Sequence, residues 1–336
     1  MRAPKHRLGG VRDLVRFAQF AARTCLQFRD YDIWHCNDIE AYVIGLVAKL
    51  MRPELQLVYD CHEFESERQG KSALYSRAVA MLEGLFIGQA GAVLTVSPSI
   101  ADAYDQRYGV RPSLARNVPH ARPDVSGDRF REAFPIGKDE TIFLYQGAMT
   151  GGRGIEDTIE AFVGLADQGI HLVLMGFGPM QAYVEQHTAS HSNMHVHPAV
   201  SYENVLEYSA SADIGLMTAA PTCLSYLYCL PNKLFEYIQA GIPILCNDLP
   251  DCRALIEQYS MGEIVPDTSP QSWRQAVRRM ADTVLSSYDR GLRQARADLH
   301  WDREEQALLG AYANLSPVPE QPTAAWTPQV RKAARH

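Results

Sequence analysis

Short apolar runs alternate with longer helical patterns along most of the chain. This alternation is typical of parallel strands joined by crossover helices, so it predicts an α/β protein with doubly wound sheets. The predicted strands of the first half are 32–35, 56–60, 92–96 and 113–116, and those of the second half are 141–145, 171–175, 194–196, 214–217, 243–246 and 263–265.

A stretch with several Pro and Gly residues separates the two halves. The chain has 336 residues, which exceeds one typical hydrophobic core, so two domains are expected. The predicted divisions are an N-terminal domain at 1–118, a linker at 119–138, a C-terminal domain at 139–300, a terminal helix at 301–315 and a disordered tail at 316–336.

The first 29 residues are strongly basic and contain an apolar stripe at helical spacing. We predict that this stripe packs on the protein's own sheet; contact with an anionic membrane surface is the alternative. The apolar positions are Val11, Leu14, Val15, Ala18, Ala21, Ala22, Cys25 and Leu26, and the basic ones are Arg2, Lys5, Arg7, Arg12, Arg16, Arg23 and Arg29.

Residues 228–246 (YCLPNKLFEYIQAGIPILC) predict a helix followed by an apolar strand. Pro231 suits the first helical position, and Gly241 accepts the positive φ that ends a helix. The free N–H groups and positive dipole end of such a helix attract anions, and Lys233 adds to that attraction. Glu236, about one turn further on, offers a carboxylate to sugar hydroxyls. The sequence therefore predicts a phosphate site with a neighbouring sugar site.

A glycine-rich loop follows the predicted strand 141–145. Parallel sheets bind ligands beyond the carboxyl ends of their strands. Gly147, Gly151 and Gly152 leave the backbone free to approach a diphosphate, and Arg153 offers a forked set of donors to its oxygens. Gly178 follows the next strand and is a weaker candidate.

Residues 145–154 (YQGAMTGGRG) together with 228–246 resemble the nucleotide-sugar glycosyltransferases of family 4. The likeness continues through 174–179, 196–200 and 212–216, and in the front half through 58–63 and 94–100, so it covers most of residues 30–314. It implies the GT-B architecture of two facing Rossmann-like domains, with the acceptor on the side of residues 1–118.

The resemblance also implies the roles of individual residues. Arg153 and Glu236 hold the donor, the nucleotide base lies against backbone near Pro198 and Val200, and His62 faces the sugar and the acceptor. The predicted catalytic residues are His62, Arg153, Lys233 and Glu236, and the predicted donor-binding residues are Gly147, Gly152, Arg153, Gly178, Pro198, Val200, Tyr228, Asn232, Lys233 and Glu236.

The activity implied is a retaining transfer without an essential metal or cofactor. In the usual proposal for such enzymes, the acceptor hydroxyl attacks on the face from which the nucleoside diphosphate leaves. We therefore expect a sugar to pass from a nucleotide sugar to a glycan, lipid-linked or small-molecule acceptor. The alternatives are a non-catalytic or obligate-partner subunit that binds a nucleotide sugar, and a GT-B nucleotide-sugar epimerase.

Two features depart from the family pattern. Tyr228 stands where the family commonly has a second Glu that touches the transferred sugar. In addition, the strands that usually begin the front domain have no counterpart before strand 32–35, which would then expose an unpaired edge. A start codon set too late, a partner chain that completes the sheet, and a degenerate relative are the three explanations.

Composition and charge bear on nucleic-acid binding, cellular location and metal binding. The formal net charge of −7 argues against nucleic-acid binding. Seven scattered cysteines without metal-type spacing, and no secretory signal, indicate a cytoplasmic protein, with a peripheral position at the inner face of the membrane as an alternative. No carboxylate pair accompanies His187, His191, His195 and His197, so no metal site is predicted there.

Overall fold

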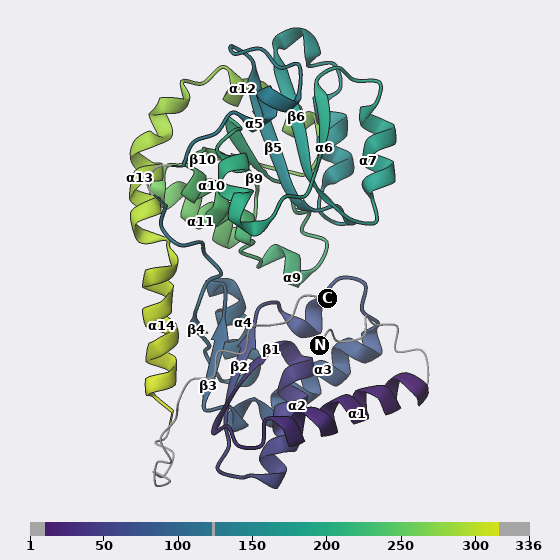
Figure 1. Ribbon diagram of the computed structural model, residues 1–336, viewed down its shortest axis with the longest axis vertical. Coiled ribbons are helices and arrows are strands. Elements are labelled where there is room, and N and C mark those ends of the chain that lie inside the picture. Colours follow the sequence, from purple (N-terminus) through teal and green to yellow (C-terminus); the bar gives the residue numbers. More distant parts are fainter. Residues whose placement is uncertain (1–10, 123–124, 316–336) are drawn as a thin grey trace.

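The computed structural model describes residues 11–122 and 125–315, which form two lobes (Figure 1). The N-terminal lobe is built on a four-stranded parallel sheet in the order β1-β2-β3-β4. Its strands are β1 (Ile33–Asn37), β2 (Gln56–Cys61), β3 (Ala92–Thr95) and β4 (Ser113–Leu114), and its helices are α1 (Val11–Gln27), α2 (Asp38–Met51), α3 (Ala73–Phe86) and α4 (Pro98–Tyr108).

The C-terminal lobe is built on a six-stranded parallel sheet in the order β10-β9-β8-β5-β6-β7. Apolar side chains pack on both faces of this sheet. Its strands are β5 (Thr141–Ala148), β6 (Ile170–Phe177), β7 (Met194–Pro198), β8 (Ile214–Met217), β9 (Ile244–Asn247) and β10 (Gly262–Val265). The helices are α5 (Arg129–Ala133), α6 (Ile155–Phe162), α7 (Gln181–Thr188), α8 (Val205–Ser209), α9 (Leu224–Leu227), α10 (Asn232–Ala240), α11 (Pro250–Tyr259), α12 (Pro270–Ala281), α13 (Asp289–Asp298) and α14 (Trp301–Ala313).

These two parallel sheets confirm the predicted α/β fold class. All the strands predicted from the sequence are present, with ends that differ by a few residues. The chain continues from β5 to β6 and β7 on one side, and then crosses to β8 on the other side of β5. The carboxyl end of β5 is therefore a point where the strand order reverses, which is where sheets of this kind bind ligands.

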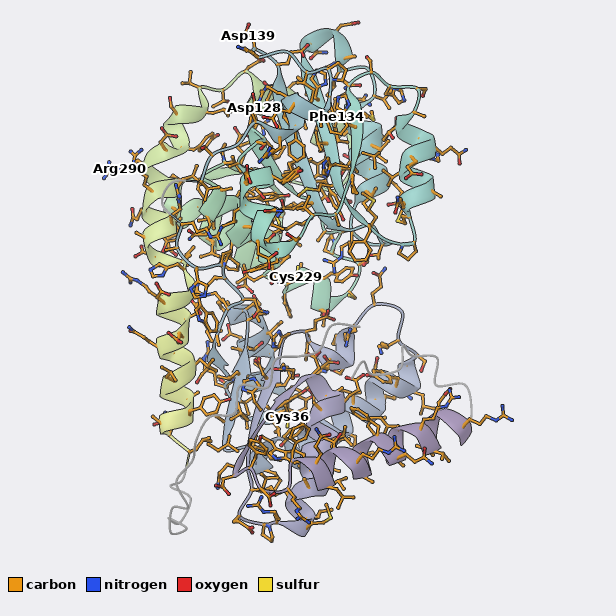
Figure 2. The ribbon with its side chains drawn as sticks, viewed as in Figure 1. Cys36, Asp128, Phe134, Asp139, Cys229 and Arg290 are labelled. Carbon is orange, nitrogen blue, oxygen red and sulfur yellow. The ribbon has the colours of Figure 1, made fainter. Side chains whose placement is uncertain are left out.

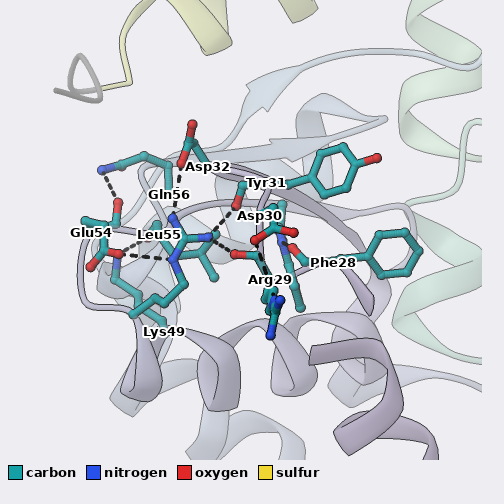
Figure 3. A network of polar contacts seen from close by, with 11 residues as sticks. Phe28, Arg29, Asp30, Tyr31, Asp32, Lys49, Glu54, Leu55 and Gln56 are labelled. Atoms are coloured by element: carbon teal, nitrogen blue, oxygen red, sulfur yellow. Dashed lines mark hydrogen bonds and ion pairs between the residues drawn. The ribbon is translucent and has the colours of Figure 1, made fainter. Parts of the chain in front are cut away.

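The strand β1 forms an edge of the N-terminal sheet. It pairs with β2 from Ile33 to Asn37, and no strand within 11–122 or 125–315 pairs with its other side. Arg52, after α2, donates to the carbonyl oxygen of Tyr31 at 3.0 Å and to the Asp32 carboxylate at 3.1 Å. These bonds belong to a network that joins segment 28–32 to the loop before β2 (Figure 3). These bonds thus fix segment 28–32, which precedes the edge strand β1, to its own lobe.

The face of α1 that packs on the lobe overlaps the predicted stripe only in part. Ala21 and Cys25 of the stripe contact the core, whereas its members Leu14, Val15 and Leu26 are exposed. Phe17 and Phe20, which the stripe did not include, are partly buried against the same core. Residues 2–7 of the basic segment lie outside the described residues. No helix in the part of the chain that the structure describes is long and apolar enough to cross a bilayer.

The helix α14 returns from the C-terminal lobe to the N-terminal sheet (Figure 1). Ala311 and Leu315 pack against Val58 and Leu94, which lie on β2 and β3. Glu304 of α14 pairs with the Arg116 guanidinium at 2.7 Å. The end of the described chain therefore belongs to the core of the first lobe.

The predicted linker 119–138 is not a free connection over its whole length. It contains α5, whose Phe130 is fully buried in the C-terminal core. The chain passes between the lobes after β4 and again before α14, and the Trp301 N–H donates to the Pro119 carbonyl at 3.0 Å. The two passages therefore lie side by side. The predicted tail 316–336 lies outside the described residues.

Glu83 on α3 is a buried carboxylate that binds three tyrosines. Tyr59 and Tyr104 donate to Oε1 at 2.7 and 2.5 Å, and Tyr108 donates to Oε2 at 2.8 Å. We expect Glu83→Ala to lower the free energy of unfolding by about 3 kcal/mol, because three hydroxyls lose their acceptor. Tyr108→Phe removes one bond and should cost about 1 kcal/mol. Urea denaturation measures both losses, and equal values would contradict the network.

Candidate functional site

A cavity of about 520 Å³ lies between the two lobes. The N-terminal lobe contributes His62, Glu63, Val96 and Asn117 to its wall. The C-terminal lobe contributes the carboxyl ends of β5 and β6, the segment 199–205 and the start of α10. Cys229, which is part of the wall, lies between the lobes (Figure 2). The cavity therefore opens where the strand order of the C-terminal sheet reverses.

The helix α10 begins one residue later than predicted. Pro231 precedes the helix with extended backbone angles, φ −72° and ψ 147°, so it is the residue before the first helical one. Gly241 ends the helix with φ 79°, as predicted. Leu234 and Ile238 are fully buried in the core, which fixes the helix with its N-terminus at the cavity. The first N–H groups of a helix lack intrahelical partners, so this end favours an anion.

Lys233 is a buried cation at this helix start. Its ammonium lies 4.1 Å from the centre of the Tyr145 ring. Among the described residues, no carboxylate lies within ion-pair distance of it. Burial, together with the neighbouring Arg153 charge, lowers the pKa of Lys233 to about 7. An ammonium in such surroundings gains strongly from a bound anion.

Arg153 brings a second cation to the same cavity. Its guanidinium lies 5.0 Å from the centre of the Tyr226 ring, and its buried Nε has no hydrogen-bond partner within the described residues. Thr218 Oγ1 donates to the Arg153 carbonyl at 2.6 Å, which fixes the loop. Gly154 has φ 69°, and a Cβ there would lie 2.0 Å from the Thr218 carbonyl oxygen, so only glycine fits. Two cations without an anionic partner thus face one cavity.

Glu236 lies on the cavity wall one turn after Lys233. Gln146, from the end of β5, donates from Nε2 to Glu236 Oε2 at 2.5 Å. Burial raises the pKa of Glu236, while the Gln146 bond and the Lys233 charge oppose that rise. The sequence reasoning missed Gln146, although a polar residue between the apolar run 141–145 and the glycine-rich loop was a usable signal.

His62 comes from the N-terminal lobe. Its Nε2 lies 3.0 Å from Asp60 Oδ2, and its Nδ1 lies 3.1 Å from the Asn117 side-chain amide. The contact with Asp60 raises the pKa of the His62 imidazole. The same Asp60 oxygen binds His35 Nε2 at 3.0 Å, and Tyr312 of α14 binds His35 Nδ1 at 2.6 Å. The His62 ring, which faces the cavity, is therefore held by a series of polar contacts that runs through Asp60 and His35 to Tyr312 of α14.

The structure brings together some of the predicted site residues and not others. The wall contains His62, Gly147, Arg153, Val200, Asn232, Lys233 and Glu236. Gly152, Gly178, Pro198 and Tyr228 are absent from the residues that line it. The residues on the wall that the sequence reasoning did not single out include Asn117, Tyr145, Gln146, Phe177, Ser225 and Tyr226.

Tyr228, a predicted donor-binding residue, contacts the N-terminal lobe. Its ring stacks on Phe64 of the N-terminal lobe, with the centroids 6.5 Å apart. Its carbonyl oxygen accepts a hydrogen bond of 2.7 Å from Ser97 Oγ. Tyr228 therefore joins the two lobes beside the cavity. Gly178 packs against the neighbouring loop, since a Cβ there would lie 2.4 Å from the Met149 carbonyl oxygen.

The four histidines set aside in the sequence do not gather into a ligand cluster. His195 is buried beside His171, with 3.1 Å between ring nitrogens, and burial lowers the pKa of His195 to about 4. Within residues 11–122 and 125–315, no group of three or more His, Cys, Asp or Glu side chains is placed to hold a metal ion.

Comparison with protein-family models gives two matches. Residues 1–120 match the glycosyl transferase 4-like domain, and residues 140–283 match the glycosyl transferases of group 1. Together the two matches cover most of the chain. An uncharacterized glycosyltransferase from Methanocaldococcus jannaschii is 23% identical over 307 residues, which span 84% of this chain and 75% of that protein.

Solved structures share the fold. Sucrose-phosphate synthase from Thermosynechococcus elongatus superposes with a TM-score of 0.76 at 17% identity, over 94% of this chain and 82% of its own. HepE from Anabaena, in complex with UDP-glucose, gives a TM-score of 0.74 at 17% identity, over 90% of this chain and 84% of its own. Both likenesses show the architecture of two facing lobes.

Proposed function

This chain belongs to the GT-B glycosyltransferases, and from that premise we propose that it transfers a sugar from a nucleotide sugar to a glycan, lipid-linked or small-molecule acceptor with retention. One observation carries the proposal. Arg153 and Lys233, two cations without an anionic partner among the described residues, meet at the start of α10 in a cavity that His62 faces from the other lobe.

The donor follows from the chemistry of the C-terminal wall. A diphosphate satisfies both cations and the free N–H groups of α10. Glu236 then lies about one helical turn further along, where its carboxylate accepts hydrogen bonds from ribose hydroxyls. HepE, a protein of the same fold, was crystallised with UDP-glucose, which supports a nucleotide sugar as the donor of this chain.

The proposed reaction exchanges one bond at the anomeric carbon. The acceptor hydroxyl attacks on the face from which the diphosphate leaves, its oxygen bonds to the anomeric carbon, and the bond to the phosphate oxygen breaks. The hydroxyl proton passes to a phosphate oxygen. Arg153, Lys233 and the amides near Asn232 stabilise the charge that grows on the leaving diphosphate, without a metal cofactor in this proposal. His62 orients the acceptor and the sugar.

Calorimetry with UDP, GDP and ADP and with their glucose conjugates tests this function. We expect one nucleotide series to bind the wild-type protein and to lose most of its affinity in Arg153→Ala. Slow donor hydrolysis without acceptor supports a transferase, whereas interconversion of the nucleotide sugar indicates an epimerase. The proposal is wrong if no nucleotide of the panel binds, or if Arg153→Ala binds as well as the wild type.

The affinity for a nucleotide sugar should depend on pH through Lys233. Burial lowers the pKa of this ammonium to about 7. Above that pH, Lys233 of the free protein is mostly neutral and must take up a proton when the diphosphate binds. We expect the dissociation constant for UDP-glucose to rise by up to about tenfold per pH unit above pH 7. Calorimetry between about pH 6 and 9 measures it, and Lys233→Met should bind weakly with no such rise.

A further inference from the structure

Gln146 is a buried side chain with both ends of its amide hydrogen-bonded. Only 3% of it is exposed, although it forms part of the cavity wall. Nε2 donates to Glu236 Oε2 at 2.5 Å, and Oε1 accepts from Ser209 Oγ at 2.7 Å. Its backbone N–H donates to the Tyr237 hydroxyl at 3.2 Å. The residue thus links β5, α8 and α10 at one point.

The partners determine which way the amide faces. A carboxylate accepts hydrogen bonds and cannot donate them, so an ionised Glu236 requires the NH₂ end of Gln146. The Ser209 hydroxyl can donate, and it meets the oxygen end. A reversed amide would place two acceptors 2.5 Å apart at Glu236. It is therefore the Glu236 carboxylate that fixes the amide; the Ser209 hydroxyl, which also lies 2.8 Å from the Val205 carbonyl oxygen, donates to the amide oxygen that this orientation presents.

The surroundings of Glu236 make this bond important. The carboxylate is largely buried, and burial favours its neutral form. The groups that oppose this are the Gln146 amide from β5 and the Lys233 ammonium from its own helix. Gln146 engages Oε2, and no described group binds Oε1, so Oε1 is the oxygen available to a ligand.

We propose that Gln146 is a positioning residue that holds Glu236 as a carboxylate facing the cavity, and so sets the affinity of the site for the ribose diol of the nucleotide. The inference rests on the proposed function and extends it to a residue that does not itself touch the diphosphate. Ser209 acts through Gln146 in the same way. Arg153 and Lys233 act on the diphosphate independently of this pair.

Gln146→Met preserves the length of the side chain and removes its hydrogen bonds. Calorimetry should compare three probes: UDP, 2′,3′-dideoxy-UDP and inorganic pyrophosphate, with the GDP and ADP pairs measured in parallel. We expect about a tenfold loss of affinity for the nucleotide with a diol, and unchanged affinity for the dideoxy nucleotide and for pyrophosphate. An equal loss for all three probes, or no loss at all, would overturn the inference.

Two serines of the same segment provide a matched pair. Ser209→Ala removes the donor to the Gln146 amide oxygen and leaves that oxygen unpaired, so it should weaken the diol-bearing nucleotide selectively. Ser211 is also buried, but its hydroxyl donates to the Glu207 carbonyl at 2.8 Å, accepts from the Arg129 backbone N–H at 3.0 Å and has no contact with Gln146. Ser211→Ala should keep the affinity of the wild type. Identical behaviour of the two variants would assign the effect to general loosening of α8.

The pH profile separates positioning from packing. The ratio of affinities for the diol and dideoxy nucleotides cancels the titration of the phosphates. In the wild type this ratio falls on the acid side, where Glu236 takes up a proton. Loss of the Gln146 bond raises the pKa of Glu236, so in Gln146→Met the fall should occur at higher pH. An unshifted profile contradicts the inference.

The same measurements distinguish this inference from the function on which it rests. A wild-type protein that binds none of the nucleotides overturns both. A wild-type protein that prefers the diol nucleotide, with Gln146→Met unchanged in that preference, overturns only the role of Gln146.

Discussion

Lys233→Ala and Arg153→Ala are each expected to lower turnover by about 100-fold or more, because each removes a fixed positive charge from the leaving diphosphate. Both side chains lie on the cavity wall, and neither has an anionic partner among the described residues. The affinity for the donor should also fall in both variants. Steady-state assays of sugar release, together with calorimetry of the nucleoside diphosphate, measure the two effects.

A surface lysine of the same lobe provides the control. Lys138 is exposed and far along the chain from either loop, so Lys138→Ala should keep the turnover of the wild type. Unchanged rates and donor binding in both Lys233→Ala and Arg153→Ala would refute the diphosphate site. A loss in only one of them would assign the leaving group to that cation alone.

His62→Ala is expected to lower transfer by about 100-fold while the affinity for UDP stays the same. The imidazole lies on the wall contributed by the other lobe, where it contacts Asp60 and Asn117. UDP lacks the transferred sugar, so it should not report the loss of a group that faces the sugar and acceptor. Rate measurements with saturating donor, combined with UDP titration, distinguish an effect of His62 on transfer from an effect on nucleotide binding.

His187→Ala is the matched control, because His187 is an exposed histidine on α7 away from the cavity wall. It should retain full transfer. If His62→Ala transfers at the wild-type rate, the role of the N-terminal wall is wrong. If it loses UDP affinity as well, His62 belongs to the donor side.

The parts of the site that could be predicted are those with a local signal. Gly241 and the glycine-rich loop after β5 have backbone conformations that few other residues adopt, so the sequence marks them directly. Arg153, Lys233 and Glu236 follow from their places on a strand end and a helix start. The cavity wall brings all three together, as expected for loops at the carboxyl ends of parallel strands.

The remaining features depend on contacts between distant segments. Nothing local indicates that Tyr228 stacks on Phe64, or that Gln146 meets Glu236, which is 90 positions further along the chain. The face of α1 was assigned only in part, because its apolar positions span a wide arc and tertiary packing selects the part with Phe17 and Phe20. The docking of α14 on the first sheet likewise needs the whole fold.

The paired passages at Pro119 and Trp301 determine how the cavity can change its width. The chain crosses between the lobes at two adjacent points, joined by a hydrogen bond of 3.0 Å. Two lobes joined by two adjacent chain segments move relative to each other by rotation about a hinge at those segments. Such a rotation widens the cavity and strains the Ser99–Asp251 and Ser97–Tyr228 contacts, which join the start of α4 in one lobe to the other lobe.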